Sequence, residues 1–293
     1  MSELHILPCL DSAELAASRR HELDIPRSVA AALGRSAVEA AQVGLYITET
    51  HQEVQWHDAV QAACAAKISI DPDTHLTVQN QTPFQETLIQ VTNETTLGAG
   101  ARLSERGLRP LVLNFANGIR PGGGFLSGAK AQEEVLCRSS ALFRTLVGDP
   151  MYEAHRQRGR PDSTNWAIYS PDVPVFRKDN GMALEKPWFL SFITCAAPYA
   201  PDIGREEARD LLNSRILRVL DIARYYAYSA LVLGAWGCGA FGNDPYSTAV
   251  DFRAALENEF TGSFSEIVFA ITDWSPERRF LGPFRDVFPQ TVS

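Results

Sequence analysis

A glycine-rich stretch in the middle of the chain is followed by two adjacent carboxylates. Three consecutive glycines, Gly122–Gly124, are separated by seven residues from the triplet Gln132–Glu134, where a helical pattern begins. Glycines leave room for a ligand to approach the backbone closely. A carboxyl group can bind sugar hydroxyls, or it can act as a general acid if a desolvated setting lets it keep its proton near neutral pH. Acidic residues also occur at helix starts because they complement the helix dipole, and this alternative stays open.

A second glycine-rich loop lies far downstream. The segment Gly234–Asp244 (GAWGCGAFGND) contains four glycines, and successive N–H groups of such a loop can point at a phosphate. No Gly-Lys-Ser or Gly-Lys-Thr follows, so the segment is not a P-loop, and its late position argues against a dinucleotide-binding fingerprint. The alternative is a glycine-rich turn with Phe241 packed into the core.

An asparagine ends the apolar segment that precedes the three glycines. In Asn114–Asn117 (NFAN), the last residue follows a predicted buried strand. Its amide offers both a donor and an acceptor, which suits a sugar hydroxyl. Asparagine also forms Asx turns in many loops, so the residue type alone does not decide between the two.

The elements around these segments must bring them together. Short apolar runs typical of strands buried on both faces alternate with helical patterns, which predicts a three-layer α/β domain. The expected strands are Thr87–Thr92, Pro110–Ala116, Trp166–Ser170, Trp188–Ala197, Ala230–Trp236 and Glu266–Thr272, and the expected helices are 93–105, 132–148, 205–228, 244–260 and 275–288. Ligands of such sheets bind at the carboxyl ends of strands, so we expect the two glycine-rich loops to form two walls of one crevice.

The first 85 residues have a different pattern. Ser28–Gly44 is predicted as a helix, Leu45–Trp56 as a small hairpin, and Asp58–Lys67 as a helix with Asp58 as its N-cap. We interpret residues 1–85 as a mainly helical accessory region and residues 86–293 as the catalytic domain.

Composition restricts the class of protein. The 293 residues carry a net charge of −8, which disfavours duplex DNA binding but not an anionic ligand, because backbone N–H groups can hold phosphates. Five scattered cysteines without a Cys-x-x-Cys pair indicate reduced thiols and argue against a zinc site, and the six histidines form no metal-ligand pattern. The sequence shows neither a membrane-spanning apolar run nor a signal peptide, so we expect a cytoplasmic protein. An acidic surface without a coiled coil favours a monomer.

Taken together, these motifs resemble those of bacterial-type poly(ADP-ribose) glycohydrolases. The glycines, the seven-residue gap and the triplet look like the family signature. NFAN and the late glycine-rich loop are similar to the family's distal-ribose and diphosphate-binding segments. Tyr169–Arg177 and Ile193–Pro198 also look like the bacterial branch. The resemblance extends from about Glu86 to the C-terminus and is weaker before it.

The resemblance implies a macrodomain-like fold, with a mixed sheet between helices and with no metal or cofactor. It implies hydrolysis of the ribose–ribose O-glycosidic bonds of poly(ADP-ribose) on modified proteins, mainly at chain ends, within ADP-ribosylation turnover and the DNA damage response. Glu134 is implied as the general acid/base, while Glu133 and Asn117 hold the distal ribose and Gln132 supports the loop. The other implied substrate-binding residues are Gly122, Gly123, Gly124, Gly237, Cys238, Gly239, Ala240 and Phe241.

Other functions stay open at this point. A non-catalytic ADP-ribose reader would not require both glutamates, a mono-ADP-ribosyl or O-acyl-ADP-ribose hydrolase usually has other motifs, and a dehydrogenase would show an early Gly-x-Gly-x-x-Gly. The sequence assigns no adenine pocket. Thr95 and Thr96 either line the cleft or cap the following helix. A segment that restricts cleavage to chain ends could come from the N-terminal region or from residues 275–280.

Overall fold

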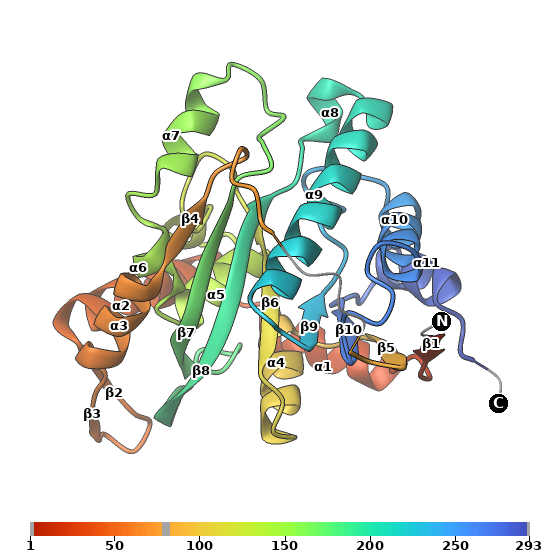
Figure 1. Ribbon diagram of the computed structural model, residues 1–293. Helices are drawn as coiled ribbons and strands as arrows, with labels where there is room; N and C mark the ends of the chain where they lie inside the picture. Colours follow the sequence, from red (N-terminus) through yellow and green to blue (C-terminus); the bar gives the residue numbers. More distant parts are fainter. Residues whose placement is uncertain (1–2, 78–82, 292–293) are drawn as a thin grey trace.

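The computed structural model describes residues 3–77 and 83–291. Within this part of the chain, eight strands form one sheet in the order β1-β5-β10-β9-β6-β8-β7-β4 (Figure 1). The first six strands of this order are parallel, whereas β7 and β4 pair in the antiparallel sense. The bounds are β1 (Glu3–Ile6), β4 (Ile68–Ile70), β5 (Glu86–Thr92), β6 (Pro110–Ala116), β7 (Ala167–Arg177), β8 (Ala183–Ala196), β9 (Ala230–Leu233) and β10 (Glu266–Ala270). The predicted α/β architecture around a central sheet is confirmed.

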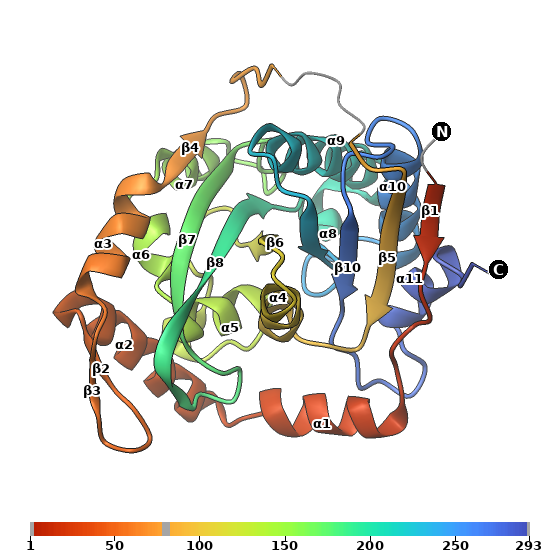
Figure 2. The ribbon, with the colours of Figure 1, turned by 60° about the horizontal axis from the view of Figure 1, so that its bottom comes forward.

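Helices cover both faces of the sheet because its central strands are apolar on both sides. Along β6, Leu111 and Leu113 face one core and Val112 faces the other, as the two-residue period of a strand requires. The first core is covered by α9 (Arg205–Tyr225), α10 (Pro245–Glu257) and α11 (Leu281–Val287). The opposite face carries α2 (Arg27–Val43), α3 (His57–Ala66), α4 (Thr96–Glu105), α5 (Gln132–Ser139), α6 (Leu142–Leu146) and α7 (Pro150–Gln157). Figure 2 shows α4 in front of the sheet, with α1 (Ala13–Leu23) lying across its lower side.

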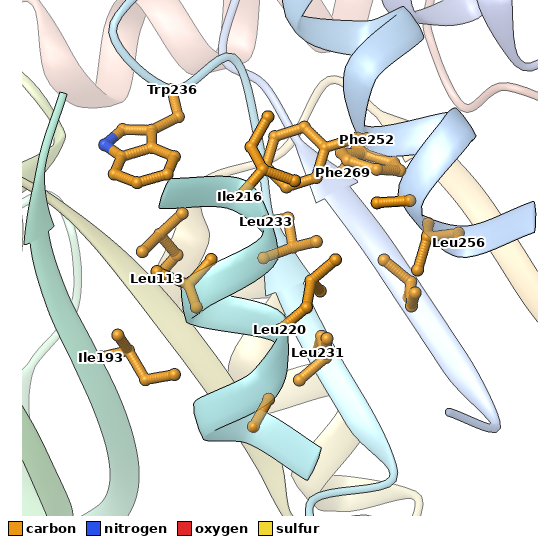
Figure 3. Packing of buried hydrophobic residues seen from close by; sticks show 14 of the residues in the cluster. Leu113, Ile193, Ile216, Leu220, Leu231, Leu233, Trp236, Phe252, Leu256 and Phe269 are labelled. Atoms are coloured by element: carbon orange, nitrogen blue, oxygen red, sulfur yellow. The ribbon is translucent and has the colours of Figure 1, made fainter. Parts of the chain in front are cut away.

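The contact between α9 and the sheet illustrates how the first core is built. Ile216 and Leu220, four residues apart on α9, lie in one cluster with Leu113 of β6 and Ile193 of β8 (Figure 3). Residues four apart share one side of a helix, so this stripe of α9 fits the apolar sheet face. Trp236, in the second glycine-rich loop, is fully buried in the same cluster. The core therefore anchors this loop at the end of β9.

The first 85 residues share the sheet with the rest of the chain. They contain the predicted helix (α2), the predicted hairpin of β2 (Leu45–Ile47) and β3 (Glu53–Gln55), and α3. The N-cap of α3 is Trp56, so the prediction of Asp58 as the cap was wrong and Asp58 lies in the first turn. The region also supplies both edge strands, β1 and β4, which the sequence did not predict. The division at residue 85 therefore stays a prediction about folding units, and it does not separate two sheets.

The predicted helix over residues 132–148 is broken in two. Ser140 is extended and forms an isolated bridge with Val175 of β7, and the N–H of Ala141 donates to the carbonyl of Pro174. The bridge explains the break, because a backbone that pairs with a strand cannot continue the helical ladder. The predicted strand Trp166–Ser170 is longer than expected, since β7 continues through an irregularity after Ser170.

Among the described residues, no helix is long and apolar enough to cross a membrane.

Candidate active site

A cavity of about 430 Å³ opens at the carboxyl ends of four neighbouring strands, β6, β9, β10 and β5. Its wall includes Asn117 after β6, Ile271 after β10 and Glu94 after β5. Neighbouring strands lie about 4.8 Å apart, so the cavity runs roughly 14 Å along this edge. From the residues singled out in the sequence, the wall contains Asn117, Gln132, Glu133, Glu134, Gly237, Gly239, Ala240 and Phe241. Asn117 and the start of α5, which flank the first glycine-rich loop, thus form one wall of the crevice, and the second glycine-rich loop forms another.

Gln132 fastens the start of α5 to β6. Its Oε1 accepts the N–H of Phe115 at 2.8 Å, and its Nε2 donates to the carbonyl of Leu113 at 2.7 Å. Nε2 also lies 3.2 Å from Oγ1 of Thr96, its third partner. These bonds fix the first residue of α5, and they thereby fix where the next two side chains point. The expected role of Gln132 in supporting the loop stays a prediction.

Glu133 is almost completely buried, with 3% of its surface exposed. Its Oε2 accepts the N–H of Asn117 at 2.7 Å, and its Oε1 accepts the N–H of Gly122 at 3.2 Å and lies 3.4 Å from Nδ2 of Asn114. One carboxyl group therefore holds both ends of the turn that connects β6 to the three glycines. Burial raises the pKa of Glu133 to about 8, against the opposing hydrogen bond from Asn117.

We expect the pKa of Glu133 to make stability depend on pH. In the unfolded chain the carboxyl group ionises near its usual value of 4.5, whereas in the folded protein it keeps its proton up to about 8. Between these values the folded state binds more protons, so its stability falls as pH rises, by at most about 1.4 kcal/mol per pH unit. The melting temperature of the wild type relative to Glu133→Gln should therefore decline from pH 5 to pH 8 and level off above. A difference in melting temperature between the two proteins that stays constant with pH would contradict the raised pKa of Glu133.

Glu134 presents one oxygen to the glycine loop and leaves the other without a partner. Its Oε1 accepts the N–H of Gly124 at 2.9 Å. Its Oε2 is buried and makes no hydrogen bond with any described residue. Glu134 belongs to the cavity wall, and only 8% of its surface is exposed. The carboxyl group is thus held through one oxygen, and the second is left without a hydrogen-bond partner.

The three glycines lie against the two glutamates and outside the cavity wall itself. Gly122 and Gly123 adopt φ values of +69° and +58°, a left-handed conformation that other residues rarely take. A Cβ atom on Gly123 would collide with Oε1 of Glu134 and lie 3.1 Å from Oε2 of Glu133. The glycines therefore allow the backbone to approach both carboxylates. Their expected contact with a ligand stays a prediction.

The second loop forms the facing wall. Phe241 lines the cavity, its carbonyl accepts the N–H of Ala200 at 2.9 Å, and its ring meets that of Tyr199 edge-on. Ala200 begins the short helix α8 (Ala200–Ile203). The N–H groups of Gly239, Ala240 and Phe241 make no hydrogen bond with other described residues. Three successive N–H groups without a partner can donate hydrogen bonds to an anion.

The side chain of Cys238 does not reach the cavity. It is buried, and its Sγ lies 3.5 Å from the carbonyl oxygen of Trp236 and 3.6 Å from Oγ1 of Thr248. Its own N–H donates to the carbonyl of Ala235 at 3.2 Å, so neither its thiol nor its N–H faces the other wall. Burial raises the pKa of the thiol to about 12, which excludes a thiolate nucleophile near neutral pH. The expected substrate-binding role of Cys238 stays a prediction, and the turn between β9 and α10 directs its side chain inward.

Further wall residues lie away from the glutamates in sequence, and apart from Thr95 and Thr96 they were not among the candidate site residues. Thr95 caps α4 by accepting the N–H of Gly98, and it also lines the cavity, so both alternatives hold. Asp179 comes from the connection between β7 and β8 and accepts a hydrogen bond from Thr95 at 2.7 Å. Phe280 belongs to the segment after β10. The remaining unpredicted wall residues include Leu23, Glu94, Ile271 and Thr272.

A fully buried arginine lies one helical turn after Glu134. The three guanidinium nitrogens of Arg138 make no hydrogen bond with described residues. Its charge interacts with Asp179 and Glu134 across the low-dielectric interior. Arg138 therefore partly balances the negative charge of the cavity wall. Among the described residues, no three His, Cys, Asp or Glu side chains are grouped so that they could hold a metal ion.

Comparison with solved structures decides the family. The chain is similar to poly(ADP-ribose) glycohydrolase (PARG) from Thermomonospora curvata, with 38% sequence identity, a TM-score of 0.84, and coverage of 89% of this chain and 100% of the other. The chain belongs to the poly(ADP-ribose) glycohydrolase family. The predicted family is thereby confirmed.

Further comparisons agree with membership of the PARG family. The family description "Microbial-type PARG, catalytic domain" matches residues 34–178. The T. curvata enzyme bound to the inhibitor ADP-HPD gives a TM-score of 0.82 at 38% identity, covering 89% of this chain and 100% of the other. PARG from Deinococcus radiodurans in complex with ADP-ribose gives 0.73 at 38% identity, covering 80% and 98%. A search of curated proteins found no match.

Proposed function

We propose that this protein hydrolyses the ribose–ribose O-glycosidic bonds of poly(ADP-ribose) and releases ADP-ribose. The observation that carries the proposal is the carboxyl group of Glu134, fixed by Gly124 through Oε1 and unpartnered at Oε2 in the wall of an elongated cavity. Membership of the PARG family supports the same activity. The three-layer arrangement with a mixed sheet supports classification as a macrodomain-like fold.

Glu134 acts as the acid and then as the base. In the first step it donates its proton to the bridging oxygen as the C–O bond to the distal ribose breaks, which leaves an oxocarbenium-like ribose. In the second step the carboxylate takes a proton from water as that water attacks the ribose carbon. Glycosidases commonly use two separated carboxyl groups. Here Glu133 is already bound to the turn after β6, so one residue performs both steps.

The rest of the cavity binds the terminal unit. Asn117 and Glu133 hold the hydroxyls of the distal ribose beside Glu134, since both line that end. The free N–H groups of Gly239 and Ala240 bind the diphosphate, an interaction that needs no basic side chain. Phe241 closes this wall. The adenosine then extends along the strand ends toward Phe280.

Cleavage at chain ends is the expected mode. Leu23 of α1 and Phe280 both line the cavity, and the guanidinium of Arg279 lies over the ring of Phe280 at 4.6 Å. These two segments border the part of the cavity assigned to the adenosine. An internal unit carries further polymer on its adenosine ribose and needs space there. Early products should therefore be free ADP-ribose, and early release of oligomers would contradict this mode.

The activity is tested by incubating the protein with poly(ADP-ribose) and, separately, with mono-ADP-ribosylated protein. Release of ADP-ribose from the polymer, with the protein-linked unit left intact, is the expected result. Binding without turnover would support a reader, and release of the protein-linked unit would support a mono-ADP-ribosyl hydrolase. We also expect a cytoplasmic monomer that acts on poly-ADP-ribosylated proteins. Five free cysteines suit a reducing compartment.

A further inference from the structure

The proposed function implies that most of the substrate lies outside the cavity. If the terminal unit extends from Glu134 toward Phe280, the bond to be cut faces Glu134. The oxygen that leaves belongs to the adenosine ribose of the preceding unit, which carries a base and a diphosphate. This preceding unit must therefore lie on the surface next to the end of β6. The turn Gly118–Pro121 directly follows β6 and Asn117, a residue of the cavity wall, and is therefore the candidate for that surface.

This turn is tied closely to the catalytic end of the cavity. Oδ1 of Asn117, a cavity residue, accepts the N–H groups of Ile119 and Arg120, both at 3.0 Å. The carbonyl of Arg120 accepts the N–H of Gly123 at 3.0 Å. Gly123 in turn packs against the carboxylate of Glu134. Arg120 is thus one hydrogen-bonded turn away from the catalytic acid.

The turn is also held rigidly from its outer side by α7. Nδ1 of His155 lies 2.9 Å from the carbonyl oxygen of Gly118, and Nη1 of Arg156 donates to the carbonyl of Ile119 at 2.8 Å. A Cβ atom on Gly118 would collide with Oγ of Ser163. Because the turn is already ordered, binding of a ligand does not cost the conformational entropy of ordering it.

The exposed side chains of the turn suit a nucleoside diphosphate. Ile119 is an apolar residue with 42% of its surface exposed. Arg120 is exposed, and its guanidinium forms no ion pair or hydrogen bond with any described residue. Arg156, which donates to the carbonyl of Ile119 in the same turn, pairs with Glu153, so of these two arginines Arg120 alone has no carboxylate partner among the described residues. An unpaired guanidinium can bind phosphate in a bidentate manner, and an exposed aliphatic side chain can pack on a base.

We propose that Ile119 and Arg120 form a leaving-side subsite that binds the adenosine diphosphate part of the polymer unit preceding the cut. The subsite rests on the proposed function, and it adds a second contact region beyond the cavity. The subsite raises the affinity for polymer relative to substrates that lack a preceding unit. It does not take part in bond breaking.

Two substrates separate this subsite from the cavity: poly(ADP-ribose), and an aryl glycoside of ADP-ribose whose leaving group is a phenol. We expect Arg120→Ala to lower kcat/KM on polymer by about 10-fold, as for loss of one exposed charged contact, and Ile119→Ala by roughly threefold. On the aryl glycoside both variants should stay within about twofold of the wild type, as should the affinity for ADP-ribose. Because an exposed charge is screened, the effect of Arg120→Ala should shrink at high salt.

Arg109→Ala is the matched control. Arg109 precedes β6 at its amino end and is exposed; it pairs with Asp172 at 3.2 Å, and its guanidinium lies 5.1 Å from the ring centre of Tyr228. Its replacement removes the same charge at the far end of the same strand. Wild-type activity on polymer in Arg120→Ala would overturn the subsite, and so would equal losses on both substrates. A wild type that releases no ADP-ribose from polymer would instead overturn the proposed function.

Discussion

Replacement of Glu134 with glutamine is expected to lower kcat for polymer hydrolysis by about 1,000-fold, a typical contribution of a general acid/base. Glutamine retains the shape of the side chain, and its Oε1 can still accept the N–H of Gly124. An amide, however, can neither donate a proton to the leaving oxygen nor accept one from water at neutral pH. The affinity for ADP-ribose, measured by calorimetry, should change by no more than about threefold, because the lost proton transfer raises the energy of the transition state and not that of the bound ground state.

Glu105→Gln provides the control for this variant. Glu105 is exposed at the last residue of α4, and its replacement makes the same chemical change far from the cavity. It should match the wild type in turnover and in melting temperature. Near-normal release of ADP-ribose by Glu134→Gln would remove this residue from the mechanism and leave Glu133 as the remaining carboxyl group of the triplet.

Replacement of Gly123 with alanine is expected to lower polymer turnover by about 100-fold or more, through the geometry of the two carboxylates. The new Cβ would occupy the position next to Oε1 of Glu134 and would also crowd Oε2 of Glu133. Backbone at φ +58° adds about 1 kcal/mol of strain for any residue with a Cβ. Hydrogen bonds hold both carboxyl groups at this buried helix start, so the new Cβ can be accommodated only if the carboxyl groups leave these positions.

Gly107→Ala isolates the conformational part of this effect. Gly107 has φ +81°, and a Cβ there would meet no atom within 4 Å. Because a similar backbone strain is introduced, this variant should show a lower melting temperature while its turnover stays that of the wild type. If both glycine variants lost stability equally and both kept activity, the close approach of Gly123 to the glutamates would have no catalytic role.

The elements that carry Asn117 and the triplet Gln132–Glu134, at the catalytic end of the cavity, could be predicted from the sequence because their determinants are local. The strand over Pro110–Ala116 has the bounds that were predicted, and the helix start at Gln132 follows from the same short segment. The order of apolar runs was sufficient to place two loops at one edge of a sheet. The residues that line this end were therefore found before their contacts were known.

The other end of the cavity depends on packing between distant segments. Asp179 sits between two strands that pair by an irregular register, and Phe280 follows β10 without a motif of its own. Leu23 reaches the cavity only because α1 lies across the sheet. The inward direction of Cys238 likewise follows from the turn after β9 and not from residue type. No periodicity or spacing in the sequence reports such long-range contacts.

The two edge strands of the sheet also constrain the order of assembly. β1 is synthesised long before its partner β5, and β4 long before its partner β7. Because such non-local pairing forms slowly, the early strands remain unpaired until their partners have been synthesised. A chain that began at residue 86 would leave β5 and β7 with open backbone hydrogen-bonding groups, the usual starting point of edge-to-edge aggregation. The N-terminal region thus replaces two long strands, β5 and β7, at the edges of the sheet with the short strands β1 and β4, which present fewer open backbone groups.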